Sequence, residues 1–166
     1  MRTLFVSVLV ALFALGACTS SQSSSEKVDY TQLVNPFIGT DFTGNTYPGA
    51  QAPFGMVQLS PDNGLAGWDR ISGYFYPDST IAGFSHTHLS GTGAGDLYDV
   101  LFMPVTLPYK EAKGELGIHS KFSHQDEEAS AGYYRVKLQD YNINVELTAT
   151  PRCGVQRYTF PKAESM

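Results

Sequence analysis

The sequence predicts an all-β fold, an antiparallel β-sandwich, on three observations. Residues 134–139 and 143–150 alternate apolar and polar side chains with a period of two, which is typical of strands that bury one face of a sheet. From Val28 onward the chain contains no convincing amphipathic helix and is rich in Gly, Tyr, Phe, Val and Thr. Further strand-like runs, separated by turn-prone residues, bring the expected number of strands to about eight.

The first residues predict a targeting segment rather than part of the fold. Residues 4–17 are apolar except for Ser7 and follow Arg2, which is too short a run to span a bilayer but fits the core of a secretory signal. The run ends in "LGAC", which resembles the bacterial lipoprotein signal, whose cysteine is lipidated after cleavage. We therefore expect a signal peptide at 1–17, a lipid on Cys18 and a location at the outer membrane of the bacterial cell envelope. An ordinary secretory signal with an incidental cysteine is the alternative.

The segment after Cys18 predicts a tether, and the folded domain follows it. Residues 18–29 are Ser-rich and have no apolar face to bury, so we expect a flexible linker there and a domain at 30–166. Because the last strand-like run is followed by no closing element, we expect the domain to be truncated and to continue in further sequence. The net charge of −5 and the lack of Lys and Arg clusters argue against nucleic-acid binding.

The strand-like runs differ in pattern along the domain. Residues 55–61 and 72–88 are strand-like, whereas 98–107 is almost continuously apolar and predicts a strand buried on both faces. The runs at 134–139, 143–150 and 155–160 predict a three-stranded meander. The intervening segment 39–55 is rich in Gly, Pro, Thr and Asn, and long loops of this kind often line functional sites.

Two histidines, His86 and His88, stand two residues apart within "FSHTHLSGTG". On a strand they would point to the same face. Three roles are then open: binding a polar ligand, satisfying buried hydrogen bonds, or ligating zinc with Cys153 or Asp96 as a third ligand. Spacing alone favours structural hydrogen bonding or ligand contact over a metal. His119 and His124 lie in a polar stretch, which predicts exposed side chains.

The single tryptophan, Trp68, lies in the Gly-flanked polar stretch "NGLAGWDRISGY" rather than in a strand pattern. A loop tryptophan can offer its flat face to a sugar ring. Asp96 and Asp99 follow in "GTGAGDLYD", but their spacing favours turn capping over a catalytic pair. No helical pattern or Gly-Lys-Ser/Thr follows that segment, so a phosphate loop is not expected.

Several stretches together resemble the N-terminal domain of glycoside hydrolase family 92, the bacterial α-mannosidases. They run in the family's order and cover most of the chain from Val34 to Pro161. As they stand here, they are "VNPFIGT", "GNTYPGAQAPFGMVQLSPD", "SGYFYPDSTIAGFSHTHLSGTG", "YDVLFMP", "GYYRVKL" and "VELTATPRCGVQRYTFP".

The resemblance implies a β-sandwich that packs on a C-terminal (α/α)₆ barrel in an inverting, calcium-dependent exo-α-mannosidase. Such enzymes release terminal mannose from N-glycans or mannans, and we expect α-1,2 linkages, although no residue here selects them. The catalytic Glu and Asp and most calcium ligands belong to the C-terminal domain in this family, so no catalytic or metal-binding residue is assigned in this chain and the chain alone should be inactive.

The resemblance also implies sugar-binding roles at the domain interface for residues of this chain. Trp68 would stack on or flank the mannose, and three polar residues, Asn45, His86 and His88, would contact it or fix the loops around it. A non-catalytic carbohydrate-binding lipoprotein that uses the same sandwich is the alternative.

Overall fold

The computed structural model describes residues 27–91, 97–108 and 117–162. The predicted signal peptide, Cys18 and Asp96 lie outside these residues. Within this part of the chain, no helix is long and apolar enough to cross a membrane. The helical segments there are short 3₁₀ turns: η1 (Tyr30–Leu33), η2 (Trp68–Arg70) and η3 (His124–Asp126).

The predicted meander is confirmed as part of a four-stranded antiparallel sheet in the order β6-β7-β8-β9. Its strands are β6 (Glu128–Ser130), β7 (Tyr133–Leu138), β8 (Ile143–Ala149) and β9 (Gly154–Thr159). Val136 pairs with Val145, and their apolar neighbours two residues away also pair across β7 and β8. This register places six apolar side chains on one buried face: Tyr134, Val136 and Leu138 of β7 and Ile143, Val145 and Leu147 of β8.

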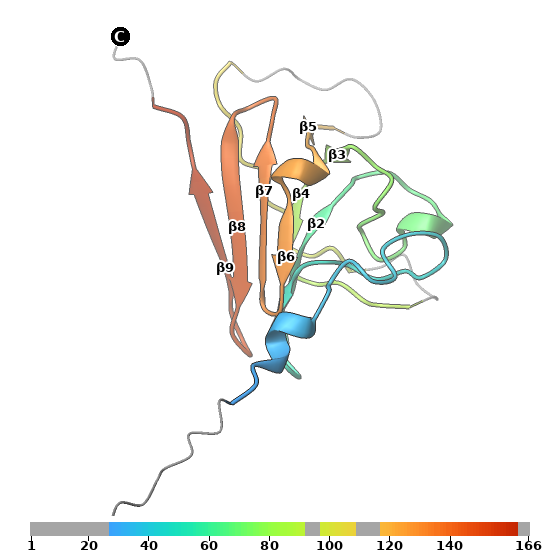
Figure 1. Cartoon of the computed structure of the whole chain (residues 1–166). Helices are drawn as coiled ribbons and strands as arrows, with labels where there is room; N and C mark the ends of the chain where they lie inside the picture. The colour runs from blue at the N-terminus through green and yellow to red at the C-terminus, as the bar shows by residue number, and fades with distance from the viewer. Residues whose placement is uncertain (1–26, 92–96, 109–116, 163–166) are drawn as a thin grey trace, which may run out of the picture.

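A second layer lies against the buried face of this sheet (Figure 1). It consists of a three-stranded sheet in the order β1-β2-β4 and a small pair, β3 with β5. The bounds are β1 (Ala50–Gln51), β2 (Gln58–Asp62), β3 (Thr80–Ile81), β4 (Gly83–Ser85) and β5 (Ser120–Lys121). Leu59 and Phe84 from this layer are fully buried in one core cluster with β7 and β8, so the predicted sandwich is confirmed.

The prediction of a strand buried on both faces at 98–107 is wrong. Only Phe102 forms a ladder bridge, with Phe84, and Val100 has a positive φ of 58° and a 62 % exposed side chain. The segment still runs beside β4, because the His86 and Phe84 amides donate to carbonyls of this segment. The positive φ at Val100 interrupts regular pairing, and the apolar side chains from 100 to 102 remain half-exposed. An apolar run therefore marks a surface here rather than the core.

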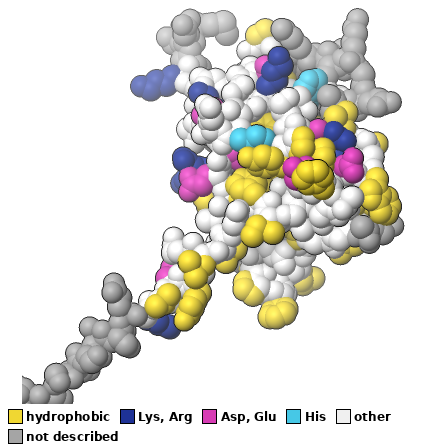
Figure 2. Space-filling model, turned by 45° about the vertical axis from the view of Figure 1, so that its right-hand side comes forward, with side chains coloured by type: hydrophobic (Ala, Val, Ile, Leu, Met, Phe, Trp, Pro, Cys, Tyr) yellow, Lys and Arg dark blue, Asp and Glu magenta, His cyan; other side chains and the backbone are white. Residues whose placement is uncertain are grey.

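Figure 2 shows hydrophobic side chains in several patches on one face of the molecule. The most exposed large ones in the described residues belong to loops and to the N-terminal turn: Leu33, Ile38, Phe42, Phe54, Met56 and Leu107. Contiguous exposed apolar surface is unusual for an isolated domain and commonly marks an interface.

Candidate functional site

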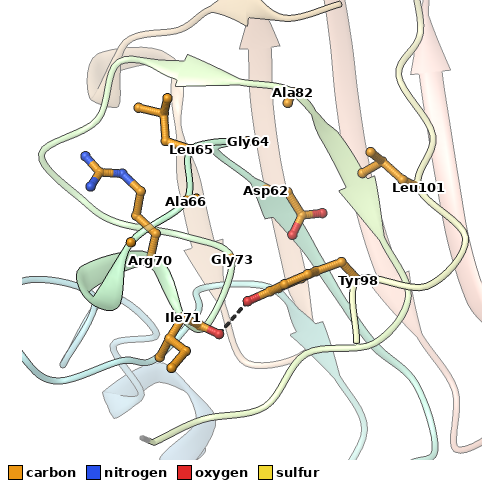
Figure 3. Close-up of a pocket in the computed structure, with 11 residues that line it drawn as sticks. Asp62, Gly64, Leu65, Ala66, Arg70, Ile71, Gly73, Ala82, Tyr98 and Leu101 are labelled. Atoms are coloured by element: carbon orange, nitrogen blue, oxygen red, sulfur yellow. Dashed lines mark hydrogen bonds between the residues drawn. The ribbon is translucent and has the colours of Figure 1, made fainter. Parts of the chain in front are cut away.

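A cleft of about 370 Å³ lies between the end of β2 and the loop that carries η2. Most of its walls are small or aliphatic. Its lining residues are Asp62, Gly64, Leu65, Ala66, Gly67, Arg70, Ile71, Gly73, Ala82, Tyr98 and Leu101. Figure 3 shows Asp62 at the end of β2, with its carboxylate between Tyr98 and Leu101. The volume falls within the range of roughly 300–1,000 Å³ typical of small-molecule pockets.

The polar floor of the cleft is a buried pair formed by Asp62 and His88. The Nε2 atom of His88 lies 2.9 Å from Asp62 Oδ1, and the side chains are 0 % and 9 % exposed, respectively. The Nδ1–H of His88 donates to the Gln58 carbonyl at 2.7 Å, and the Ser85 hydroxyl lies 3.2 Å from Nε2. Both ring nitrogens are thus engaged inside the domain, so the geometry gives His88 a structural role.

Gly73 allows this pair to lie against the backbone. Its φ is +88°, and a Cβ at this position would come within 2.5 Å of Asp62 Oδ1 and 3.0 Å of His88 Cδ2. Only glycine combines a left-handed backbone with such a close approach. Gly73 therefore helps to set the position of the Asp62 carboxylate.

His86 occupies a different environment from His88. Its Nδ1 atom lies 3.1 Å from the Val100 carbonyl, and its ring packs edge-on against Phe102. The prediction that both imidazoles point to the same face of a strand is wrong, because β4 ends at Ser85 and neither histidine lies on it. His86 and His88 therefore contact different residues: His86 contacts Val100 and Phe102, whereas His88 contacts Gln58, Asp62 and Ser85.

The zinc alternative finds no support among the residues that the structure describes. Within 27–91, 97–108 and 117–162, no group of three or more His, Cys, Asp or Glu side chains is placed to hold a metal ion. Cys153 is exposed, and Asp96 lies outside these ranges. The Asp99 carboxylate accepts a hydrogen bond from the hydroxyl of Thr87, 12 residues away, at 3.0 Å, so the turn-capping role stays a prediction.

Trp68 begins η2 on the loop that borders the cleft, and its side chain is 58 % exposed. It does not line the cleft itself. Its neighbour Arg70 does, but the guanidinium donates to both carboxylate oxygens of Asp78 and lies 4.9 Å from the Phe75 ring centroid. The hydrogen bonds to Asp78 raise the pKa of Arg70. Arg70 therefore acts mainly to fix the loop, while sugar contact by Trp68 stays a prediction.

Asn45 joins the long loop at 39–55 to the histidine segment. Its carbonyl accepts from the Gly91 amide at 2.7 Å, and its φ of +50° is one that asparagine tolerates. The side chain is buried, and its Oδ1 atom receives no hydrogen bond from any described residue. This loop position fits the expectation that Asn45 fixes loop geometry, and direct ligand contact remains a prediction.

A second buried carboxylate, Glu127, was not anticipated from the sequence. Its side chain is 1 % exposed and accepts hydrogen bonds from the hydroxyls of Tyr134 and Tyr74 at 2.6 and 2.9 Å. The His124 Nδ1 atom lies 2.6 Å from Glu127 Oε2, and its Nε2 atom lies 2.8 Å from the Tyr76 carbonyl. His124 is half-buried rather than freely exposed as predicted: its side chain is 34 % exposed, and the ring stacks on Tyr76 and pairs with Glu127. Burial, and then the negative charge of Glu127, raises the pKa of Tyr134 well above its ordinary value.

Sequence reasoning missed Asp62 and Tyr98 as residues of the cleft. Asp62 ends β2, a largely buried strand, immediately before Asn63 and Gly64, which is also the signature of a turn. Tyr98 belongs to the run 98–107, whose apolar pattern predicts a buried strand. A charged residue at the last position of an otherwise buried strand was the available signal, because such a group needs a specific partner.

The comparisons with known proteins agree with this architecture. The model of the glycosyl hydrolase family 92 N-terminal domain matches residues 33–166. The structure is similar to that of the GH92 α-mannosidase BT3965 from Bacteroides thetaiotaomicron, solved alone and with mannoimidazole. The TM-score is 0.77, with 48 % identity over 82 % of this chain and 19 % of that chain.

More distant relatives match over the same region. The family GH92 inverting mannosidase BT2199 from Bacteroides thetaiotaomicron has 30 % identity over 84 % of this chain and 19 % of its own, with a TM-score of 0.62. A protein of Arthroderma benhamiae described as an uncharacterized secreted glycosidase has 27 % identity over 91 % of this chain and 20 % of its own length.

This chain thus spans about a fifth of the length of the proteins it resembles. The family match covers far more than half of its residues, and the solved relatives share its sandwich. The chain belongs to glycosyl hydrolase family 92, of which it forms an N-terminal domain.

Proposed function

We propose that this chain is the substrate-shaping domain of an inverting, calcium-dependent exo-α-mannosidase that removes terminal mannose, α-1,2-linked, from N-glycans or mannans. The observation that carries the proposal is the 48 % identity to a GH92 α-mannosidase solved with mannoimidazole, over 82 % of this chain. The cleft beside η2 supports it, since a pocket with apolar walls and a few polar groups suits a sugar ring.

The exposed apolar loops support a partner domain within the same polypeptide. Phe54 is fully exposed, and Phe42 and Leu107 are nearly so, although burying such side chains is strongly favourable. We propose that a C-terminal helical domain covers part of this surface and brings the catalytic acid and base. An inverting glycosidase needs two carboxyl groups roughly 6.5–9.5 Å apart. In this proposal the chain binds and orients the sugar, and the partner domain supplies the proton transfers.

Calcium would be held mainly by that partner domain. The described residues of this chain do not gather three carboxylates or imidazoles around one point, and calcium takes six to eight oxygen ligands in proteins. The ion would supply a positive charge that binds sugar hydroxyls. Within this chain, Trp68 would flank the sugar, and Asn45, His86 and His88 would hold the surrounding loops.

The test is hydrolysis of the four α-linked mannobioses (1,2, 1,3, 1,4 and 1,6) by the full-length protein, with and without a calcium chelator. We expect cleavage of the α-1,2 disaccharide, its loss on chelation and its return with calcium. The first product observed by NMR should be β-mannose, because inversion changes the anomeric configuration. Binding of mannosides without any hydrolysis would support the alternative, a non-catalytic carbohydrate-binding lipoprotein.

The anchor is a separate part of the proposal. The "LGAC" stretch and the Ser-rich linker support lipidation of Cys18 and attachment to the outer membrane, and acyl chains contribute about 0.8 kcal/mol per buried CH₂. Cys18→Ser should move the protein from the membrane fraction to the soluble fraction and abolish labelling by a fatty-acid analogue. Unchanged labelling would contradict the lipid anchor without affecting the proposed activity.

A further inference from the structure

One carboxylate oxygen in the cleft is buried without a partner. The Oδ2 atom of Asp62 receives no hydrogen bond from any described residue, whereas Oδ1 of the same group faces His88 at 2.9 Å. The Asp62 side chain is only 9 % exposed, and the residue lines the cleft. Buried polar atoms are normally satisfied, and a carboxylate oxygen is a strong acceptor. This oxygen is thus an unmet acceptor in the wall of the cleft, and a donor that enters the cleft reaches it only when a neighbouring side chain moves aside, because the atom itself is buried.

A count of protons gives the charge of the Asp62–His88 pair. The Gln58 carbonyl can only accept, so His88 Nδ1 carries a proton. A second proton must lie between His88 Nε2 and Asp62 Oδ1, which are 2.9 Å apart. One negative carboxylate, one neutral imidazole and one additional proton sum to zero. The pair is thus neutral overall, and Oδ2 remains an acceptor wherever the second proton lies.

This neutrality limits the chemistry of the ligand. The group facing Oδ2 must be a donor, which argues against a carboxylate or phosphate. A cation would bring an unbalanced positive charge into a cleft with largely aliphatic walls and with Arg70 in its lining, which is unfavourable at low dielectric. A neutral hydroxyl meets both conditions.

The walls favour a ring with an apolar face. Leu65, Ile71 and Leu101 surround the opening with Tyr98, while glycines at 64, 67 and 73 keep the backbone accessible. Tyr98 is fixed in place by donating its hydroxyl hydrogen to the Ile71 carbonyl (Figure 3). A pyranose ring presents C–H faces to such walls and hydroxyls at its edge.

We propose that this cleft binds one hexopyranose unit of the glycan, with a ring hydroxyl donating to Asp62 Oδ2 while His88 holds the carboxylate in place. The assignment of that unit as mannose rests on the proposed function. Asp62, which ends β2, is then the ligand-contacting residue, and His88 contributes through it.

The experiment uses the full-length protein and two replacements of Asp62. Asp62→Ala removes the acceptor together with the shared proton, and the Ser85 hydroxyl, 3.2 Å away, can then donate to the free His88 Nε2. Asp62→Asn keeps an oxygen for the ligand if its amide donates to His88. We expect Asp62→Ala to raise the Kd for methyl α-D-mannopyranoside and the KM for mannobiose by about tenfold or more, and Asp62→Asn to stay within about threefold.

A second pair of variants tests the proposal even if the Asp62 variants fail to fold. One variant fills the cleft, and the other is its control. Ala66→Phe adds a ring to an exposed residue of the cleft lining without touching the buried pair. Ala131→Phe makes the same change at an exposed residue outside the cleft. We expect the first to weaken methyl α-D-mannopyranoside binding by about tenfold and the second to leave it unchanged.

The outcomes separate this inference from the proposed function. Mannobiose hydrolysis with unchanged KM and Kd in both Asp62→Ala and Ala66→Phe would overturn the cleft assignment alone. A lower melting temperature with unchanged Kd in Asp62→Ala would likewise overturn it, because the oxygen would then serve the fold. If no mannobiose is cleaved, binding of methyl hexosides that responds to the variants in this way still supports a hexopyranose cleft.

Discussion

The imidazole of His86 lies directly against the backbone of Gly154, at the start of β9. A Cβ at residue 154 would come within 2.8 Å of His86 Cδ2, so these two residues, far apart in the sequence, depend on each other. The contact joins the histidine segment after β4 to the edge strand of the other sheet. It explains why a glycine begins a strand that otherwise carries larger side chains.

The first prediction follows from this contact. Gly154→Ala should displace the His86 ring and break its hydrogen bond to the Val100 carbonyl, at a cost of about 0.5–1.5 kcal/mol of unfolding free energy. In a His86→Ala background the same change should cost much less, because the clash is gone. Chemical denaturation of the two single variants and the double variant gives the coupling. If the changes in unfolding free energy of the two single variants simply add in the double variant, residue 154 and the His86 ring do not clash.

Trp68 provides the second prediction. Because its side chain is mostly exposed, Trp68→Ala should leave the melting temperature nearly unchanged. If it flanks the sugar, kcat should fall or KM should rise by about tenfold or more in the full-length enzyme. Tyr30→Ala, which removes a still more exposed aromatic side chain on η1, serves as the control and should leave the kinetics unchanged. Wild-type kinetics for Trp68→Ala would remove this residue from the sugar site.

The third prediction compares two adjacent glutamates. Glu127→Gln should lower the free energy of unfolding by about 1–3 kcal/mol, because an amide NH2 then faces His124 Nδ1 in place of an acceptor oxygen and the negative charge that the buried tyrosine hydroxyls share is lost. Glu128→Gln should change it by less than about 0.5 kcal/mol, since the Glu128–Arg135 pair is more than half exposed. Urea denaturation measures both values. Similar effects from the two variants would contradict a central role for the Glu127 cluster.

The fourth prediction concerns alkaline pH. Burial raises the pKa of Tyr158 to about 12, whereas a tyrosine in the unfolded chain ionises near pH 10. A raised phenol pKa gives a contribution to stability that is complete below about pH 10 and is lost as the pH rises toward about 12.

Tyr158→Phe should therefore make the loss of stability between these pH values less steep. Denaturation at a series of alkaline pH values checks the slope, and the ultraviolet absorbance of phenolate reports the ionisation. Tyr30→Phe is the exposed control and should leave the slope as in the wild type. An identical slope for Tyr158→Phe would mean that Tyr158 ionises as freely in the fold as in the unfolded chain.

Local patterns in the sequence determined most of the sheet. The alternation in 134–139 and 143–150 required one buried face, so the pairing of β7 with β8 followed within a residue at each end. Alternation is a local property that burial enforces directly. The same reasoning failed for 98–107, because hydrophobicity alone does not distinguish a core strand from an irregular segment with exposed apolar side chains.

The candidate site depended on contacts that no local pattern contains. His88 and Trp68 were recognised as unusual from the sequence, but their positions differ: one is buried beneath the cleft, and the other is exposed beside it. Asp62 lies 26 residues from His88 in the sequence, and Gly154 lies still farther from His86.

The sequence by itself thus determined the strands and the family resemblance, because these depend on residue order and on periodicity. Only the tertiary structure decided which carboxylate faces the cleft, because a buried polar group is defined by partners that folding brings together from distant segments.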